Sequence, residues 1–300
     1  MTKPKLLLVD GMAVLFRNYF ATAAVNQYFR TAEGLATNGV QGFIRHVLTA
    51  KMLMKPTHMA ICWDMGAYTF RNDLYAGYKA NRPAPPDDMK HQFDLSKEVS
   101  AQLGWKNYGL AGIEADDFIG SFSERYKEDA EITIISGDKD LLQLLAPTVQ
   151  VAFMKKGFHI YDSYTEERFT KEYGILPRQF ADVKAFMGDP SDGYPGVKGI
   201  GPKQALDFIR TYGSVEGVLS SLHELKPGQR KKIEEQLDML KLSKDLAEIR
   251  TDVPLETQLD ELAVPVYSPA LIPMLERQEL GLVARHIEKF SGAPQEDPFA

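Results

Sequence analysis

Three short apolar runs, each followed closely by an aspartate, set the pattern of the chain. They cover residues 5–9, 57–63 and 131–136, and apolar positions dominate each run instead of alternating with polar ones. Such runs are typical of strands buried in a parallel sheet. Segments with helical spacing separate the runs, so the order of elements predicts an α/β fold with a mostly parallel central sheet flanked by helices.

Helical periodicity and turn residues predict the remaining elements of this first domain, which we assign to residues 1–173. A Lys-Lys-Gly turn at residues 155–157 favours a β-hairpin after the third strand. The expected helices are residues 12–28, 38–54, 87–103 and 141–145, and the expected hairpin strands are residues 149–154 and 158–161.

The second part of the chain, residues 174–290, is predicted to be helical. Pro254, Pro265 and Pro269 indicate an irregular connection within it, and residues 291–300 are expected to form a tail. The predicted helices are residues 204–212, helices around 228–249, and residues 270–290 with breaks at Pro273 and Gly281.

Composition is that of a globular protein. Of 300 residues, 44% are hydrophobic and 25% are charged, and no apolar run reaches the length that a membrane span needs. Cys62 is the only cysteine, so an intrachain disulfide is excluded and a cytoplasmic location is expected. The net charge of −6 argues against a nucleic-acid partner, but basic residues concentrate at 71–82 and 198–210, so charge does not decide the matter.

Acidic residues stand where the apolar runs end. Asp10 and Asp64 follow the first two runs, and ligands of α/β sheets collect at the carboxyl ends of the strands. Each aspartate could form a turn or bind a metal ion. Met12 occupies the position at which haloacid-dehalogenase-like phosphatases need a second aspartate, which excludes that class.

Two further acidic clusters strengthen the metal interpretation. Glu114, Asp116 and Asp117 lie at the predicted start of a helix, where they could either cap the helix or hold a hard cation that relieves their mutual repulsion. Asp138 and Asp140 follow the third run, and alternate residues of an extended segment point the same way.

Two segments have the character of nucleic-acid contacts. Residues 69–86 mix aromatic and basic side chains, and Tyr78, Lys79 and Arg82 lie within about one helical turn, so the segment is either a contact surface for a single strand or an exposed loop. The glycine-rich residues 187–203, before the predicted helix 204–212, suggest a helix-hairpin-helix that grips a phosphodiester backbone; a purely structural hairpin is the alternative.

Seven motifs in register resemble the bacterial and phage 5′-3′ exonuclease / flap endonuclease family, which includes the N-terminal nuclease domain of bacterial DNA polymerase I. The resemblance extends from Lys5 to about Leu280. The motifs are Leu8-Val9-Asp10-Gly11, Trp63-Asp64, Thr69-Phe70-Arg71, Tyr78-Lys79-Ala80-Asn81-Arg82, Glu114-Ala115-Asp116-Asp117, Gly137-Asp138-Lys139-Asp140, and Gly188-Asp189 through Gly199-Ile200-Gly201.

The resemblance implies a PIN-like nuclease domain with a helical arch at about residues 71–103, followed by a helix-hairpin-helix domain. It implies hydrolysis of 5′-flap and 5′-ended duplex DNA by a monomer that uses two divalent ions, Mg²⁺ or Mn²⁺. We expect Asp10, Asp64, Glu114 and Asp116 to favour one ion and Asp116, Asp138, Asp140 and Asp189 the other, with Asp117 and Asp192 acting partly through water. Asp10 and Asp116 are also expected to be catalytic.

The same mapping assigns the DNA contacts. Lys79 and Arg82 would lie at the base of the arch and act on the scissile phosphate, so both are expected to be catalytic as well. The hairpin is expected to bind branched or nicked duplex, and its carbonyls to hold a K⁺ ion. The expected DNA-binding residues are Arg17, Arg71, Tyr78, Lys79, Arg82, Gly196, Lys198, Gly199, Gly201 and Lys203.

Two departures from the family bear on these expectations. Gly193 stands where the family usually has Asn, which puts the support of Asp192 in doubt. The polymerase domains that follow the nuclease in DNA polymerase I are absent, which favours a free-standing nuclease. A PIN-type ribonuclease and a catalytically silent DNA-junction binder are the alternative functions. The first would need neither arch nor hairpin, and the second would lack acids that this sequence retains.

Overall fold

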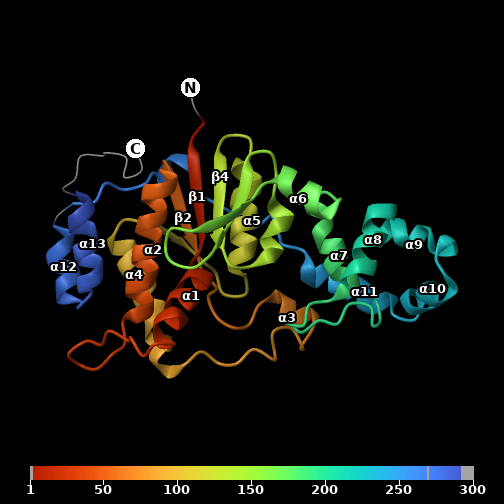
Figure 1. The fold of residues 1–300 in the computed structure, drawn as a ribbon, viewed down its shortest axis with the longest axis horizontal. Helices are drawn as coiled ribbons and strands as arrows, with labels where there is room; N and C mark the ends of the chain where they lie inside the picture. Colours follow the sequence, from red (N-terminus) through yellow and green to blue (C-terminus); the bar gives the residue numbers. More distant parts are fainter. Residues whose placement is uncertain (1–2, 269, 292–300) are drawn as a thin grey trace.

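A single six-stranded sheet forms the centre of the molecule. The computed structural model describes residues 3–268 and 270–291. The strand order is β3-β2-β1-β4-β5-β6, in which only β6 is antiparallel to its neighbour, as the apolar runs predicted (Figure 1). The strands are β1 (Lys5–Asp10), β2 (His58–Cys62), β3 (Lys106–Tyr108), β4 (Glu131–Ser136), β5 (Val149–Met154) and β6 (Tyr161–Tyr164).

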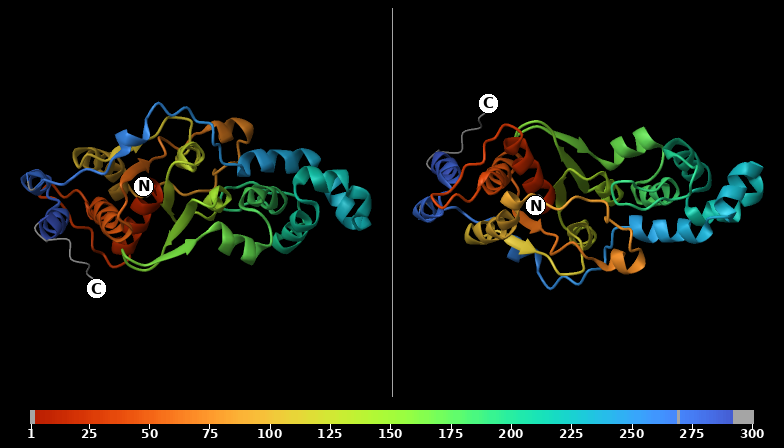
Figure 2. Two further views of the ribbon diagram at one scale, coloured as in Figure 1. Left: turned by 90° about the horizontal axis from the view of Figure 1, so that it is seen from above. Right: turned by 90° about the horizontal axis from the view of Figure 1, so that it is seen from below.

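Helices cover both faces of the sheet. On one face, α1 and α2 pack on the sheet and α4 packs on α2, and their apolar side chains form one core with those of the C-terminal hairpin α12–α13 (Figures 1 and 2). On the other face lies α5, whose Phe118, Ile119 and Phe122 are buried against the strands. These helices are α1 (Gly11–Ala23), α2 (Asn38–Met54), α4 (Asp87–Gln102), α5 (Ala115–Tyr126), α12 (Leu271–Arg277) and α13 (Gly281–Ser291).

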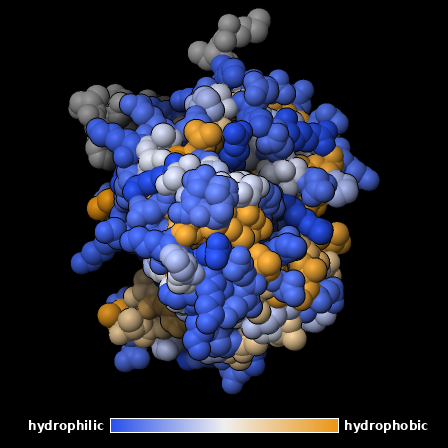
Figure 3. Space-filling model, turned by 90° about the vertical axis from the view of Figure 1, so that its right-hand side faces the viewer, coloured by the Kyte–Doolittle hydropathy of each residue, from blue (hydrophilic) through white to orange (hydrophobic). Residues whose placement is uncertain are grey.

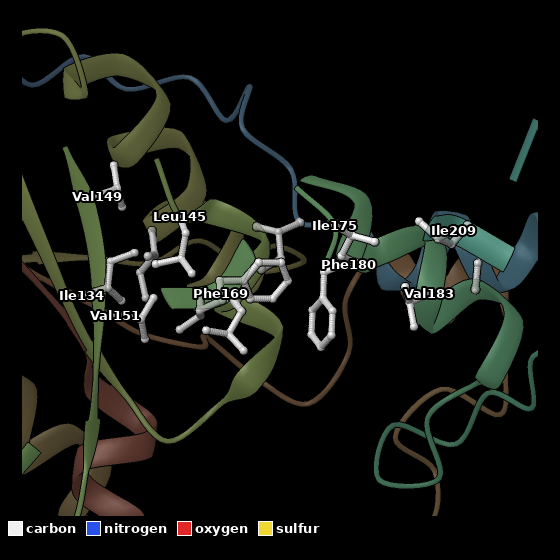
Figure 4. Close-up of a cluster of buried hydrophobic side chains, with 14 of the residues drawn as sticks. Ile134, Leu145, Val149, Val151, Phe169, Ile175, Phe180, Val183 and Ile209 are labelled. Carbon is white, nitrogen blue, oxygen red and sulfur yellow. The ribbon is translucent and has the colours of Figure 1, made fainter. Parts of the chain in front are cut away.

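The core on the α5 face continues into the helical part of the chain. Figure 4 shows Ile134 and Val151 of the sheet, Phe169 and Phe180 beyond it, and Ile209 at the far side, all in one cluster of buried side chains. The elements of this part are α6 (Glu166–Tyr173), α7 (Phe180–Met187), α8 (Pro202–Tyr212), α9 (Val215–Ser220), α10 (Pro227–Glu234) and α11 (Leu237–Ala247), with the 3₁₀ turns η2 (Pro177–Gln179) and η3 (Leu222–Glu224).

The structure corrects several predicted element boundaries. Helix α1 ends at Ala23, five residues early, and Asn26 beyond it has a positive φ of 55° that a helix cannot accommodate. The second hairpin strand begins at Tyr161, where the antiparallel pairing with Met154 begins, and not at Phe158. Strand β3 was not predicted, because three residues carry too little pattern. The segment after β4 is a 3₁₀ turn, η1 (Lys139–Leu144); another, η4 (Leu259–Leu262), precedes α12.

The predicted arch has helices only at its two ends. Helix α3 (Phe70–Leu74) begins it and α4 ends it, whereas the residues between them form turns and extended chain. We call residues 75–86 the bridge segment; in Figure 1 it runs from α3 to α4 along one side of the molecule. Pro83, Pro85 and Pro86 account for its irregular backbone.

The predicted C-terminal helix is divided in two. Pro273 lies in the first turn of α12, where its missing N–H is not needed, and the break falls between Arg277 and Gly281. Glu279, in this break, has a φ of 57°. The predicted tail lies outside the described residues from 292 onward.

The surface carries no membrane-spanning element in the described part of the chain, since no helix there is long and apolar enough to cross a bilayer. Seen from the end that carries the helical elements, the molecule is mainly hydrophilic, with apolar side chains in separate patches (Figure 3).

Candidate active site

Three of the predicted acids lie at the carboxyl ends of neighbouring strands. Asp10 ends β1, Asp64 follows β2 by two residues, and Asp138 follows β4 by two residues. Because β1 lies between β2 and β4 in the sheet, the three carboxylates converge at one edge. The position of these acids just after apolar runs predicts this placement.

Asp10 is held in place by two donors. One carboxylate oxygen accepts the N–H of Ala13, as the N-cap of α1, at 2.9 Å, and the other accepts the hydroxyl of Ser136 at 2.6 Å. Burial raises its pKa to about 7, and repulsion from Asp64 and Asp138 adds to the shift. A nearby positive charge would therefore strongly stabilise the ionised form of this carboxylate.

The start of α5 brings further acids to the same edge. Asp64 accepts the N–H of Ala115 at 2.7 Å, and burial raises the pKa of Asp64. Burial also raises the pKa of Asp116 well above its usual value, with repulsion from Asp138 and Asp10 next in size. Asp116 is half-buried, and its repulsion by Asp138 and Asp10 indicates that these carboxylates lie near it.

The bridge segment places basic groups against these acids. Lys79 donates to Glu114 at 2.9 Å, and Arg82 donates to Asp192 at 2.6 Å. A backbone bond from the Lys79 N–H to the Asp192 carbonyl, at 2.7 Å, fixes the segment to the loop after α7. Lys79 and Arg82 thus lie beside the acids Glu114 and Asp192.

Tyr78, one of the expected DNA-binding residues, lies inside the molecule. Its ring is 3% exposed, and its hydroxyl contacts Glu114 at 3.2 Å and Asp192 at 3.3 Å. The ring belongs to a small buried cluster with Ala181 and Tyr194. Tyr78 therefore joins the bridge segment to the helical part, and no face of its ring is open to a base.

The structure also gives Arg71 and Asp117 a place that differs from their predicted roles. Arg71 was predicted to bind DNA and Asp117 to bind a metal ion, yet the two form a bidentate ion pair with both distances at 2.8 Å. Arg71 is 2% exposed, Asp117 is fully buried, and Arg71 also donates to the carbonyls of Leu246 and Glu248. The pair therefore joins α3, α5 and the segment after α11 and is unavailable to ligands.

Sequence reasoning missed Lys184, which lies between two of the predicted metal ligands. Its ammonium donates to Asp140 and to Asp189. Burial raises the pKa of Asp140 to about 7 in spite of this cation, with repulsion from Asp138 contributing. Carboxylate oxygens of Asp140, Asp189 and Asp192 lie within 4.8 Å of one another, close enough to share one ion.

Two signals in the sequence could have identified the missed residues. Ser136 stands two residues before Asp138 and donates to Asp10, and its hydroxyl also accepts the Asp138 N–H at 3.0 Å. Lys184 is a lysine in an otherwise apolar stretch of α7, and it lies five residues before Asp189. A polar residue at a buried position next to an acidic cluster indicates a partner for that cluster.

The structure also explains the glycine at position 193. Gly193 has a φ of 81°, and a Cβ there would lie 2.6 Å from the Gly77 carbonyl oxygen of the bridge segment. Asp192 is supported instead by Arg82 and Tyr78. The absence of Asn therefore permits a close backbone contact, and Asp192 does not lack hydrogen bonds.

The predicted duplex-binding hairpin connects α7 to α8. Lys198, Gly199, Gly201 and Lys203 are exposed there, whereas Gly196 is buried, and a Cβ on it would lie 2.3 Å from the Gly188 nitrogen. Gly196 is therefore a packing residue and not a DNA contact. The Gly199 carbonyl accepts the Lys232 ammonium at 2.9 Å, so α10 supports the hairpin.

Sequence comparisons agree with this geometry. The family model described as the N-terminal resolvase-like domain of 5′-3′ exonucleases matches residues 5–174, and the model of their C-terminal SAM fold matches residues 175–269. The chain belongs to the 5′-3′ exonuclease family. This membership makes it an enzyme and favours the nuclease interpretation over a catalytically silent binder.

Individual relatives cover the chain to different extents. The 5′-3′ exonuclease of Bacillus subtilis (strain 168) is 47% identical over 291 residues, or 97% of this chain and 98% of that protein. DNA polymerase I of Bacillus caldotenax is 39% identical over 263 residues, which is 87% of this chain but 30% of the polymerase. The T5 D15 protein, co-crystallised with metal ions, shares the fold with a TM-score of 0.67 at 19% identity, over 96% of this chain and 99% of that one.

Proposed function

We propose that this member of the 5′-3′ exonuclease family cuts phosphodiester bonds at 5′ flaps and 5′ ends of duplex DNA with the help of two divalent metal ions. The observation that carries the proposal is a group of three acids, the buried Asp10 and the half-buried Asp64 and Asp116, which form no ion pair with any described residue and whose pKa values are raised. Hard cations would offset the repulsion among these carboxylates and are the ions that carboxylate oxygens bind best.

The residues fit the ions that we propose. All donors in the site are carboxylate oxygens, which suit Mg²⁺ and Mn²⁺ better than softer metals. Asp10, Asp64, Glu114 and Asp116 would hold one ion, and Asp116, Asp138, Asp140 and Asp189 the other, with Asp192 close to the second group. Two ions so held would lower the pKa of an attacking water and stabilise the leaving oxygen.

The basic side chains of the bridge segment complete the site. The Lys79 side chain is 23% exposed and that of Arg82 is 49% exposed, so both can reach a phosphate while they remain next to Glu114 and Asp192. Their positive charge would orient the scissile phosphate and stabilise the charge that develops on it. The Lys198–Lys203 hairpin would hold the duplex through its backbone, a contact that does not depend on base sequence.

Cleavage of a 5′-flap duplex labelled at its 3′ end tests the activity. We expect cuts near the flap junction with Mg²⁺ and none with EDTA. Activity that persists in EDTA would exclude the metal mechanism.

The role of Lys79 is tested separately, with Lys171→Ala on α6 as a control of equal charge change. Lys79→Ala should reduce turnover by about 10²-fold and change duplex affinity by less than about threefold, because the ammonium acts on the developing charge. An equal loss of affinity and turnover would place Lys79 in general DNA binding.

A further inference from the structure

A pocket of about 120 Å³ lies on the α1–α2 face of the sheet. Helices α1 and α2 form two of its walls, the turn between β5 and β6 forms a third, and Leu282 at the start of α13 completes it. None of the residues that line it is acidic. Its volume is sufficient for several water molecules and therefore for a small polar group.

Two arginines give the pocket its charge. Arg17 of α1 and Arg45 of α2 both line it, and neither forms an ion pair with a described residue. Burial lowers the pKa of Arg45, and repulsion from Arg285 adds to the effect. Partly buried guanidinium groups are normally paired with acids, and within the described part of the chain no acid pairs with either of these two.

The walls of the pocket are held firmly. The Arg45 guanidinium lies over the Phe158 ring, 5.0 Å from its centre, so the β5–β6 turn orients it. Asn18 donates to the Val14 carbonyl at 2.7 Å. His46, next to Asn18, is 1% exposed, and its Nε2 has no hydrogen-bond partner among the described residues. The arginines are therefore presented on a preformed surface.

We propose that this pocket binds a phosphate group through Arg17 and Arg45. Guanidinium groups bind phosphate through paired N–H donors, and no carboxylate in the lining competes for them. Arg17 lies seven residues after Asp10 on α1, about 10 Å along the helix axis, so this phosphate is distinct from the one at the acids.

The phosphate could belong to a DNA strand or to a small molecule. If it belongs to DNA, the pocket extends the proposed function by holding a nucleotide beyond the scissile bond. If it is free phosphate or a mononucleotide, the pocket is a ligand site in its own right. The chemistry of recognition is the same in both cases, and direct binding measurements distinguish them.

The test measures inorganic phosphate binding by calorimetry, with the full chain in EDTA so that no metal ion binds phosphate at the acids. Arg45→Gln should weaken phosphate binding at least tenfold, whereas Arg178→Gln, an equal charge change outside the pocket, should leave it unchanged. Ala21→Leu, which fills the pocket and retains both arginines, should weaken binding as well. Equal affinity in the wild type, Arg45→Gln and Ala21→Leu, or no binding at all, would overturn the proposal.

A second arm identifies the source of the phosphate. The same variants are titrated with 5′-flap DNA in EDTA, followed by fluorescence anisotropy. A several-fold loss of DNA affinity in Arg45→Gln, with competition by inorganic phosphate, assigns the pocket to DNA. A loss of phosphate binding with unchanged DNA affinity assigns it to a free ligand. Neither arm requires cleavage, so failure of the proposed nuclease activity would be recognised separately.

Discussion

Six acids of the active site form two groups of three that differ in what neutralises them. Glu114, Asp117 and Asp192 each contact a basic side chain from the α3 and bridge region, at 2.9, 2.8 and 2.6 Å respectively. Asp10, Asp64 and Asp116 contact none among the described residues and have raised pKa values. We call the first group the paired acids and the second the bare acids.

The comparison shows that sequence motifs do not distinguish structural acids from ligands. Asp116 and Asp117 are neighbours in one motif, yet Asp117 is fully buried with Arg71 while Asp116 faces the strand-end acids. A basic side chain already offsets the charge of each paired acid, so these acids depend less on a cation than the bare acids do. The bare acids repel one another until a cation arrives, so the two groups should respond oppositely to mutation.

The largest effect is expected from a bare acid. Asp116→Asn should lower the single-turnover cleavage rate about 10³-fold, because loss of a metal ligand removes several kcal/mol of transition-state stabilisation. The metal-free variant should be at least as stable as the wild type, since a repulsive charge has been removed. Cleavage within tenfold of the wild type would place Asp116 outside the metal site.

A paired acid should show the opposite behaviour. Arg71→Gln leaves the buried Asp117 carboxylate unpaired and should destabilise the fold by about 3–5 kcal/mol, measured by urea denaturation. Replacing both partners by apolar residues, as Arg71→Met with Asp117→Leu, should recover much of this loss. If the single variant were as stable as the wild type, the pair would not be the structural link that we describe.

The pH dependence of stability separates the groups further. The pKa of Asp10 is about 7 in the fold against an ordinary value of 3.8, so its destabilising effect begins as the pH rises above about 4 and is complete only above about 7. In EDTA, Asp10→Asn should therefore raise the melting temperature less at pH 5 than at pH 8. Burial lowers the pKa values of His46 and His286 to about 4, which makes the stability of the fold rise with pH. This effect is the same in the wild type and in Asp10→Asn, so it cancels when their melting temperatures are subtracted.

Lys184 gives the smallest and most specific effect, because it pairs two acids that a metal ion would also bind. Lys184→Gln should tighten Mn²⁺ binding several-fold, since no ammonium has to be displaced from Asp140 and Asp189, and should lower the metal-free melting temperature. Lys171→Gln is the matched control. Weaker Mn²⁺ binding in Lys184→Gln would show that the ammonium organises the ligands instead of competing for them.

Much of the fold followed from local pattern, because apolar runs and acids at strand ends are visible within a few residues. Four of the five parallel strands, β1, β2, β4 and β5, were predicted, and so was the place of Asp10, Asp64 and Asp138 at or just after strand ends. The role of Arg71 could not be predicted in this way. Its partner Asp117 is 46 residues away and the Leu246 carbonyl is 175 residues away, so only the packed structure shows that its charge is internal.

The same limit applies to Tyr78 and Gly196. Aromatic and glycine residues in a motif suggest contacts with DNA, but Tyr78 is buried in a cluster with Ala181 and Tyr194, and Gly196 packs against residues 186–188. Burial depends on tertiary packing, which overrides the meaning of a residue type in isolation. Basic residues of the same motifs reach solvent, and we continue to propose that they contact DNA. They are Lys79, Arg82, Lys198 and Lys203.

The hydrophobic core that joins the sheet to the helical elements has a consequence for how the gene can vary. The two family models meet between residues 174 and 175, yet Phe169, Ile175 and Phe180 on either side of this join share one core. A fragment cut here would expose those side chains to water. Recombination can therefore exchange the two halves between relatives only where the side chains at the join fit together, so the pair is inherited as one unit.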